Sequence, residues 1–438
     1  MRQTTLLRNL IMTMMMMATA PSWGQDAAGS DALLNGYVQQ MIDASLPASE
    51  QPAATTRSAL DHLTGNEARV YNQLLSKLHD IAAGRQLTAQ IDIAPEDICG
   101  EKCVWTAADL GVASLVDQGY ITEEATNAAW AKLAFDINAV MWALTADLPY
   151  DLYWYDKTKG MRYTTAMLNC DYETLYMTGS YTFFFYVSKD YSVNGEAGTF
   201  DMKPGIVASV DDAIANAAAI VEANKDKPLL EKLQAYREAI CQRVSYNFEA
   251  AGAGSFAYGN PWQLVWVFDD DATTNVVCEG YSKAFKYLCD LSELGPSAEC
   301  LIVMGSLVKD TGSESHMWNV MKMDDGRSYH VDVTNCDEGM SGYPDKLFLT
   351  YGPTGTYSYF TFKETGVTYN YNDETKTLFT EEELTISATA YDPATGISLT
   401  PTLSKGEGAW FGLDGHRLDG QPTRKGLYIR NGKKVIIK

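Results

Sequence analysis

The first part of the chain, residues 25–145, has the spacing of amphipathic helices. Apolar residues recur there at intervals of three or four positions, and the segment 68–81 places Val70, Leu74 and Leu78 on one stripe. A stripe of this kind is typical of a helix that covers a hydrophobic core. The spacing therefore predicts a helical N-terminal region.

The second part, residues 146–375, mixes strands with helices. Aromatic residues alternate with polar ones over much of 146–204, which predicts strands, and helix-like runs follow at 210–225 and 228–244. More alternating segments begin at residue 316. This mixture predicts an α+β fold.

The last part, residues 376–438, shows short strand-like segments separated by Gly and Pro turns. Its final segment, 426–438, has a hairpin pattern with Asn431 and Gly432 as the turn. We expect a small C-terminal β module here. The segment from 410 onward also resembles the terminal sorting modules of bacteria that use a type nine secretion system, and the alternative is an ordinary edge hairpin.

A candidate nucleophile lies in the middle of the second part. Cys278 follows the apolar pair Val276 and Val277 and opens a helix-like run that Gly295 and Pro296 end. A cysteine at the start of a helix lies beside unpaired backbone N–H groups and the positive end of the helix dipole. Both favour the thiolate form.

A candidate base and acid follow on one hairpin. An alternating run starts at His316, and residues 324–326 read as its turn. A three-residue loop would place His316 opposite Thr334 and make Asp332 its diagonal neighbour on the same face, within reach of a long side chain. We expect two further aromatic side chains on this face, Trp318 and His330.

These residues lie in motifs that resemble those of a known family. The segments VCEGYSKAF, HMWNV and YHVDVTN are similar to the three motifs of the bacterial transglutaminase-like superfamily, a circularly rearranged relative of the papain fold. The family's nucleophile matches Cys278, its base matches His316, and its orienting acid matches Asp332. The resemblance covers about residues 205–340 and implies a papain-like core, in which a helix that carries the cysteine packs on an antiparallel sheet.

The resemblance implies thiol-dependent acyl transfer on amide bonds of a protein or peptide substrate, with no cofactor and no metal. If water resolves the acyl-enzyme, the protein is a cysteine peptidase or amidase, which we favour. If an amine resolves it, the protein is a cross-linking transglutaminase. A different alternative is a secreted binding or scaffold protein without turnover, in which Cys278 is a structural thiol. Within the enzyme hypothesis, His330 is the alternative to His316 as the base.

Acyl transfer also needs donors where the oxyanion forms. The backbone N–H of Cys278 is one candidate, and the side chain of Trp262, Gln263 or Tyr246 is the second; the sequence does not choose among these three. A zinc site is not indicated, because the chain lacks paired Cys-x-x-Cys motifs and its five histidines are scattered.

Composition and charge bear on location and partners. Hydrophobic residues make up 46% of the chain, and the net charge of −22 argues against nucleic acid or an anionic membrane as partner. Residues 1–24 read as a secretory signal, with Arg2 and Arg8 before an apolar stretch at 10–20, and no later apolar run is long enough for a membrane span. We therefore expect an exported protein, located in the periplasm, at the cell surface or outside the cell.

Eight cysteines in an exported chain predict disulfides. Cys99 and Cys103 are the expected local bridge, and a redox-active pair is the alternative. Cys241 and Cys289 lie on helix-like segments and are expected to be buried thiols.

Overall fold

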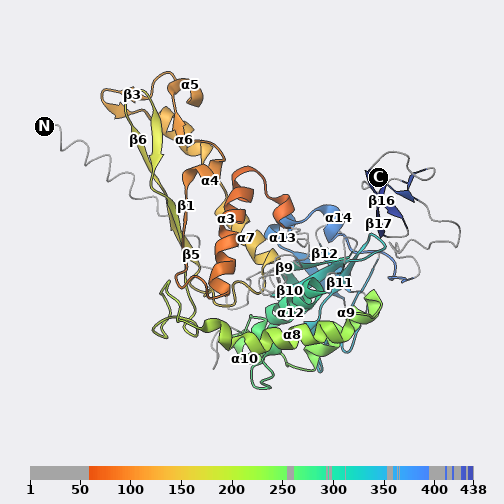
Figure 1. The fold of residues 1–438 in the computed structure, drawn as a ribbon. Coiled ribbons are helices and arrows are strands. Elements are labelled where there is room, and N and C mark those ends of the chain that lie inside the picture. The colour runs from red at the N-terminus through yellow and green to blue at the C-terminus, as the bar shows by residue number, and fades with distance from the viewer. Residues whose placement is uncertain are drawn as a thin grey trace. The chain divides into compact units, whose positions relative to one another are not determined.

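The computed structural model describes most of the chain beyond residue 58 (Figure 1). The described residues are 59–253, 261–292, 294, 298–310, 312–352, 359–362, 364, 366–393, 410–411, 417–418, 426–430 and 433–437. The expected signal segment, residues 1–24, lies outside them. The chain divides into two compact units, Met1–Pro393 and Ala394–Lys438.

The first unit contains both helices and strands, and the predicted α+β class is confirmed. Its helices are α3 (Gly65–Ala82), α4 (Pro95–Cys99), α5 (Ala107–Leu110), α6 (Glu123–Lys132), α7 (Ile137–Asp147), α8 (Asp211–Asn224), α9 (Leu229–Cys241), α10 (Phe248–Ala253), α11 (Val265–Phe268), α12 (Cys278–Leu291), α13 (Asp373–Leu378), α14 (Glu381–Leu384) and the 3-10 turns η1 (Leu60–His62), η2 (Ile206–Ser209) and η3 (Thr334–Cys336). Its strands are β1 (Gln90–Ile93), β2 (Val104–Trp105), β3 (Val116–Asp117), β4 (Tyr120–Ile121), β5 (Met161–Thr164), β6 (Met167–Cys170), β7 (Leu175–Thr178), β8 (Tyr181–Phe185), β9 (Glu299–Lys309), β10 (Gly312–Lys322), β11 (Ser328–Val331), β12 (Tyr359–Phe362) and β13 (Val367–Tyr371).

Helices make up much of the described N-terminal region, but two of its strands pair with strands that follow residue 145. β1 pairs with β8 in the sheet β1-β8-β5, and β2 pairs with β7 in the sheet β2-β7-β6. A short strand such as β1 needs a partner for its backbone N–H and C=O groups. The expected boundary at residue 145 therefore falls between strands that belong to the same sheets.

The other expected boundary, at residue 376, lies within the first compact unit. The first unit continues to Pro393. Leu384 and Ile386 are buried in it, and the N–H of Ser387 donates to the carbonyl of Ser328 at 2.7 Å. Burial of these apolar side chains keeps the segment after α13 with the first unit.

The centre of the first unit is an antiparallel sheet of five strands in the order β11-β10-β9-β13-β12. Helix α12 packs against β9 and β10, and α8 and α9 pack against α12 (Figure 1). Tyr281, Phe285 and Leu288 of α12 are fully buried in this packing.

The five-stranded sheet is strongly curved. In a flat sheet the two edge strands, four places apart, would lie about 19 Å from each other. Instead the ring of His330 on β11 stacks on Phe360 of β12, with ring centroids 4.8 Å apart. Gly305 allows β9 and β13 to approach closely, because a Cβ at this position would lie 1.7 Å from the carbonyl oxygen of Asn370 on β13. The curvature turns one face of the sheet into a buried interior.

The second unit is a four-stranded antiparallel sheet in the order β15-β14-β16-β17. Its strands are β14 (Trp410–Phe411), β15 (Arg417–Leu418), β16 (Gly426–Arg430) and β17 (Lys433–Ile437). Arg430 pairs with Lys433, as in the predicted hairpin, whose turn residues Asn431 and Gly432 lie outside the described residues.

Over the described part of the chain, no helix has the length and apolarity that a membrane crossing requires.

Candidate active site

Cys278 is the first residue of α12, where the sequence predicted a helix to begin. Val277 is its N-cap residue, and the preceding Val276 forms a parallel bridge with Tyr246. The first helical turn lies close to Val276, because a Cβ on Gly280 would be 2.6 Å from the Cβ of that valine. A larger residue at 280 would push the turn away. The glycine thus fixes where the half-buried thiol of Cys278 lies.

Two polar side chains join the start of α12 to β10. The hydroxyl of Ser282 donates to the carbonyl of Met317 at 3.0 Å, and the side-chain amide of Asn319 donates to the carbonyl of Ser282 at 3.1 Å. Met317 follows His316 directly, and Asn319 lies three residues beyond it. They hold the thiol-bearing turn and the imidazole-bearing strand together.

His316 and Asp332 meet on one hairpin, in the register that the sequence predicted. Asn319 pairs with Val331, and the N–H of Met323 donates to the carbonyl of Arg327 at 2.9 Å across the turn. This register places Nε2 of His316 2.8 Å from Oδ2 of Asp332. The diagonal relationship expected from the alternation is therefore present in the fold.

Asp332 is completely buried and hydrogen-bonded through both carboxylate oxygens. Oδ2 accepts from His316, from the side chain of Asn335 at 2.6 Å and from the hydroxyl of Tyr369 at 2.8 Å, while Oδ1 accepts from the backbone N–H of Asn335 at 3.1 Å. Burial by itself would raise the pKa of Asp332. The imidazole of His316 and these hydrogen bonds outweigh burial and hold that pKa below its ordinary value. Asp332 is an anion in the fold.

His316 carries the opposite shift. Burial would lower the pKa of its imidazole, but the charge of Asp332, their hydrogen bond and an interaction with Cys278 raise that pKa to about 10. Since Asp332 occupies Nε2, Nδ1 is the ring nitrogen available to the thiol of Cys278. The three side chains thus stand in the order acid, imidazole, thiol, the arrangement that an activated sulfur nucleophile needs.

The competing histidine has a different environment. His330 is fully buried, and neither of its ring nitrogens has a hydrogen-bond partner among the described residues. Its ring lies 4.2 Å from that of Tyr369, centroid to centroid. Burial, with a smaller contribution from His316, lowers the pKa of His330 to about 3 despite the opposing effect of Asp332. His330 is therefore a neutral part of the curved interior.

The three oxyanion candidates lie in different surroundings. The phenol of Tyr246 interacts with Cys278, and burial together with that thiol raises the pKa of Tyr246 well above its usual value, so its hydroxyl stays protonated. The side-chain amide of Gln263 donates instead to the carbonyl of Leu152 at 3.0 Å. Trp262 is buried, and the ammonium of Lys157 lies 4.5 Å from the centre of its ring.

Two residues that hold Asp332 were not singled out from the sequence. Asn335 lies within the YHVDVTN motif, three residues beyond Asp332. This spacing is a local signal for a turn in which the Asp332 side chain accepts the N–H of Asn335. Tyr369 had only a weak signal. Alternation places it on one face of β13 together with Tyr371, but the sequence does not say which strand lies next to β13.

The eight cysteines are all thiols in the structure. The expected bridge between Cys99 and Cys103 is not formed, although their sulfur atoms lie 3.2 Å apart. Cys289 is buried, as expected, and Cys241 is partly buried. Within the described ranges, no group of three or more His, Cys, Asp and Glu side chains is arranged to hold a metal ion.

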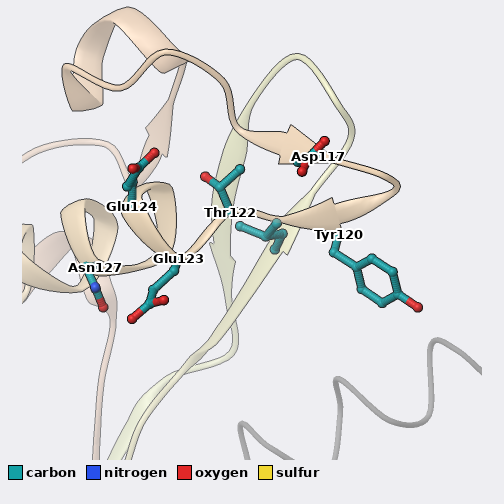
Figure 2. Close-up of a pocket in the computed structure, with 7 residues that line it drawn as sticks. Asp117, Tyr120, Thr122, Glu123, Glu124 and Asn127 are labelled. Atoms are coloured by element: carbon teal, nitrogen blue, oxygen red, sulfur yellow. The ribbon is translucent and has the colours of Figure 1, made fainter.

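The first unit also has an open hollow of about 610 Å³ between the β3–β4 hairpin and the start of α6 (Figure 2). Its lining residues are Asp117, Tyr120, Ile121, Thr122, Glu123, Glu124 and Asn127. The three carboxylates are exposed, and the hydroxyl of Thr122 caps α6 by accepting from the N–H of Ala125 at 3.2 Å. The hollow is lined by no thiol and no imidazole, so we assign it no part in acyl chemistry.

Comparison with known proteins adds a distant likeness. No family model matches the chain, and no curated protein sequence matches it. A solved crystal structure of a TGase is 16% identical, with a TM-score of 0.23, over 43% of this chain and 48% of that one. This chain therefore spans about half the length of that structure. A likeness at this level carries no information on activity.

Proposed function

We propose that the protein is an exported thiol-dependent acyl-transfer enzyme that acts on amide bonds of proteins or peptides, with hydrolysis as its reaction. The observation that carries this proposal is the position of His316. Its imidazole is hydrogen-bonded to the buried anion Asp332 at 2.8 Å and also interacts with Cys278. A buried carboxylate in contact with an imidazole beside a half-exposed thiol is costly for folding alone, which favours a role in chemistry.

In the proposed reaction Cys278 is the nucleophile and His316 carries the proton. Because the pKa of His316 is raised to about 10, the thiol proton is held on Nδ1 of the imidazole before attack, and the Sγ thiolate then attacks the carbonyl carbon of the amide. As the C–N bond breaks, the imidazolium returns a proton to the leaving amine and a thioester remains. Water, deprotonated by His316, then attacks the thioester, releases the acid and restores the thiol. Asp332 holds the imidazole with its N–H on Nε2 throughout.

Tyr246 is our choice for the second oxyanion donor, beside the backbone N–H of Cys278. That N–H lies in the first turn of α12, where a helix leaves its donors without an intrahelical acceptor. Of the three side-chain candidates, Tyr246 is the one whose interaction with Cys278 affects its pKa, and its hydroxyl keeps its proton at neutral pH. Two protonated donors around one carbonyl oxygen would stabilise the tetrahedral intermediate. Tyr246→Phe should slow turnover by about 10²-fold.

The test is to incubate the purified protein with a peptide library, with and without an added primary amine, and to analyse the products by mass spectrometry. Hydrolysis gives cleaved or deamidated peptides in both samples. Incorporation of the amine would instead assign a cross-linking transglutaminase. Cys278→Ala should abolish turnover and leave the fold intact, whereas Cys170→Ala, which removes another half-buried thiol, should retain it. A library left unchanged while Cys278 is reduced and reacts with alkylating reagents would favour the binding or scaffold alternative.

A further inference from the structure

A cluster of buried charges lies one residue from the proposed nucleophile. The carboxylate of Glu279, which is 4% exposed, forms an ion pair at 2.5 Å with each of two lysines. Lys283 comes from the next turn of α12, and Lys157 comes from 122 positions earlier in the chain. Their side chains are 1% and 16% exposed. Charged groups with so little access to water are rarely retained unless they are paired.

The same two lysines contact the segment 261–263, which packs against the start of α12. The ammonium of Lys157 lies over the ring of Trp262, and that of Lys283 donates to the side-chain oxygen of Gln263 at 3.4 Å. The backbone closes the connection, because the carbonyl of Pro261 accepts from the N–H of Val277 at 2.9 Å. Val277 immediately precedes Cys278. One ionic group therefore joins this segment to the nucleophile's helix.

Lys157 itself is held by a rigid turn. The N–H of the preceding Asp156 donates to the carbonyl of Tyr186 at 2.8 Å, and the carboxylate of Asp156 accepts from the N–H and hydroxyl of Thr158 at 3.0 and 2.6 Å. Asp156 is buried. The turn therefore presents the lysine from a fixed backbone rather than from a free loop.

We propose that Lys157, Glu279 and Lys283 form an ionic clamp, and that Lys157 is a positioning residue for acyl transfer at Cys278. The clamp holds the segment 261–263 against the first turn of α12, so that the thiol and the backbone N–H of Cys278 keep one geometry during attack. Through Lys157, the clamp also makes a residue that precedes the transglutaminase-like segment 205–340 necessary for the reaction. This inference rests on the proposed function and adds a residue to it.

The expected effect follows from the sensitivity of such reactions to placement. A displacement of about 1 Å at a reacting group costs about 10²-fold in rate. Lys157→Met keeps most of the apolar stem and leaves Glu279 paired with Lys283, so the protein should fold while the clamp loses its contact with Trp262. Lys157→Arg keeps both the charge and the interaction with an aromatic ring. It should restore most of the rate.

Acylation by p-nitrophenyl acetate tests the clamp without knowledge of the natural substrate. The Cys278 thiolate forms a bond with the acetyl carbon, the ester C–O bond breaks, His316 keeps the thiol proton, and the absorbance of the released p-nitrophenolate gives a burst. The full chain would be compared with Lys157→Met, Lys157→Arg and the matched control Lys159→Met, which removes an exposed lysine two positions along the same turn. Thermal melts by circular dichroism show whether each variant is folded.

We expect a burst about 10- to 100-fold slower in Lys157→Met, near wild-type rates in Lys157→Arg and Lys159→Met, and no burst in Cys278→Ala. If folded Lys157→Met matches the wild type, or if Lys157→Arg is as slow as Lys157→Met, the clamp is refuted while the proposed function stands. If the wild type itself gives no burst, the proposed function fails and the clamp with it. Should Lys157→Met not fold, the isosteric Glu279→Gln replaces it, and a wild-type burst in that variant refutes the clamp.

Discussion

Tyr369 donates its hydroxyl to the carboxylate oxygen of Asp332 that also accepts the His316 N–H. Asp332 follows β11 at one edge of the five-stranded sheet, whereas Tyr369 lies on β13, three strands away in the sheet order. A contact between them exists only because the sheet curves. The orientation of the imidazole therefore depends on the closure of the whole sheet, as well as on the hairpin that carries His316 and Asp332.

Tyr369→Phe should weaken this connection without opening a cavity, because the ring remains in contact with His330. The variant loses a hydrogen bond to a charged group, which contributes about 1.5–3 kcal/mol to the free energy of unfolding. We also expect turnover to slow about tenfold, as a less firmly held Asp332 orients His316 less well. Urea unfolding and steady-state kinetics measure the two effects. Tyr371→Phe is the matched control, because its hydroxyl donates to the neutral carbonyl of Leu384 at 3.0 Å; equal losses in both variants would contradict the prediction.

The sequence predicted the parts of the site that depend on local spacing. Alternation and the turn at 324–326 were sufficient to bring His316 to Asp332, because the register of a short hairpin is set by its loop. The helix start at Cys278 was equally local. The contact of Tyr369 with Asp332 was not predictable, because it depends on the pairing of β9 with β13 and on the curvature of the sheet. Neither quantity is encoded within a short segment.

The clamp shows the same limit at longer range. Lys157 lies in the segment 146–204, for which alternation predicted strands, and nothing in its sequence neighbourhood pointed to Glu279. The pairing of β1 and β2 with strands that follow residue 145 was not predictable from the sequence for a related reason. Partners separated by many residues are chosen by tertiary packing, for which a single sequence holds little local signal.

His316, rather than His330, should be the base. His316→Ala should abolish turnover, because it removes the group that takes the thiol proton. His330→Phe should retain most of the activity, because His330 is a neutral buried ring between Phe360 and Tyr369. Turnover by each purified variant, with circular dichroism to check folding, decides the assignment. An active His316→Ala beside a folded but inactive His330→Phe would reverse it.

Asp332→Asn should slow turnover by about 10⁴-fold, because the amide can stabilise the wrong imidazole tautomer. As the pH is raised, the residual activity should also begin to fall at a lower pH than the activity of the wild type does. Asp332 opposes the effect of burial and raises the pKa of His316 to about 10, so without its charge the imidazolium loses its proton earlier. Profiles of kcat/KM against pH measure the alkaline limb. Superimposable alkaline limbs in the two proteins would remove Asp332 from the mechanism.

The stability of the pair should depend on pH in a defined window. The folded-state pKa of His316 lies above its ordinary value of 6.5, so its contribution is complete below pH 6.5 and is lost as the pH rises to about 10. The folded-state pKa of Asp332 lies below its ordinary value of 3.8, so its contribution is present above pH 3.8 and is lost on further acidification. The free energy of unfolding should therefore differ most between wild type and Asp332→Asn from pH 3.8 to 6.5. A difference that grows toward pH 9 would contradict the assignment.

The C-terminal unit should be dispensable for chemistry. The first unit ends at Pro393, and the four-stranded sheet of the second unit is formed by its own strands. Deletion of residues 410–438 should leave the melting temperature of the remaining chain and its acylation burst unchanged. If the tail is a sorting module, the deletion should change where the protein is found after cell fractionation. Failure of the truncated chain to fold would instead make the hairpin an integral part of the core.

Alkylation tests the nucleophile without reference to any substrate. Cys278 is half-buried beside an imidazole, whereas burial raises the pKa of Cys241 to about 12 and that of Cys289 well above its ordinary value. Thiolates are the reactive form. We therefore expect iodoacetamide at about pH 6 to label Cys278 first in the folded protein, as peptide mapping would show.

His316→Ala should slow this labelling at the same pH, because the neighbouring cation that stabilises the thiolate is gone. Cys170 is the internal control, since it is half-buried too but is distant along the chain from Cys278 and from His316. Equal labelling of Cys170 and Cys278 would mean that His316 does not activate the thiol. Label on Cys241 or Cys289 with Cys278 unmodified, or recovery of Cys278 in a disulfide, would make the site structural, and the enzyme proposal would then have to be abandoned.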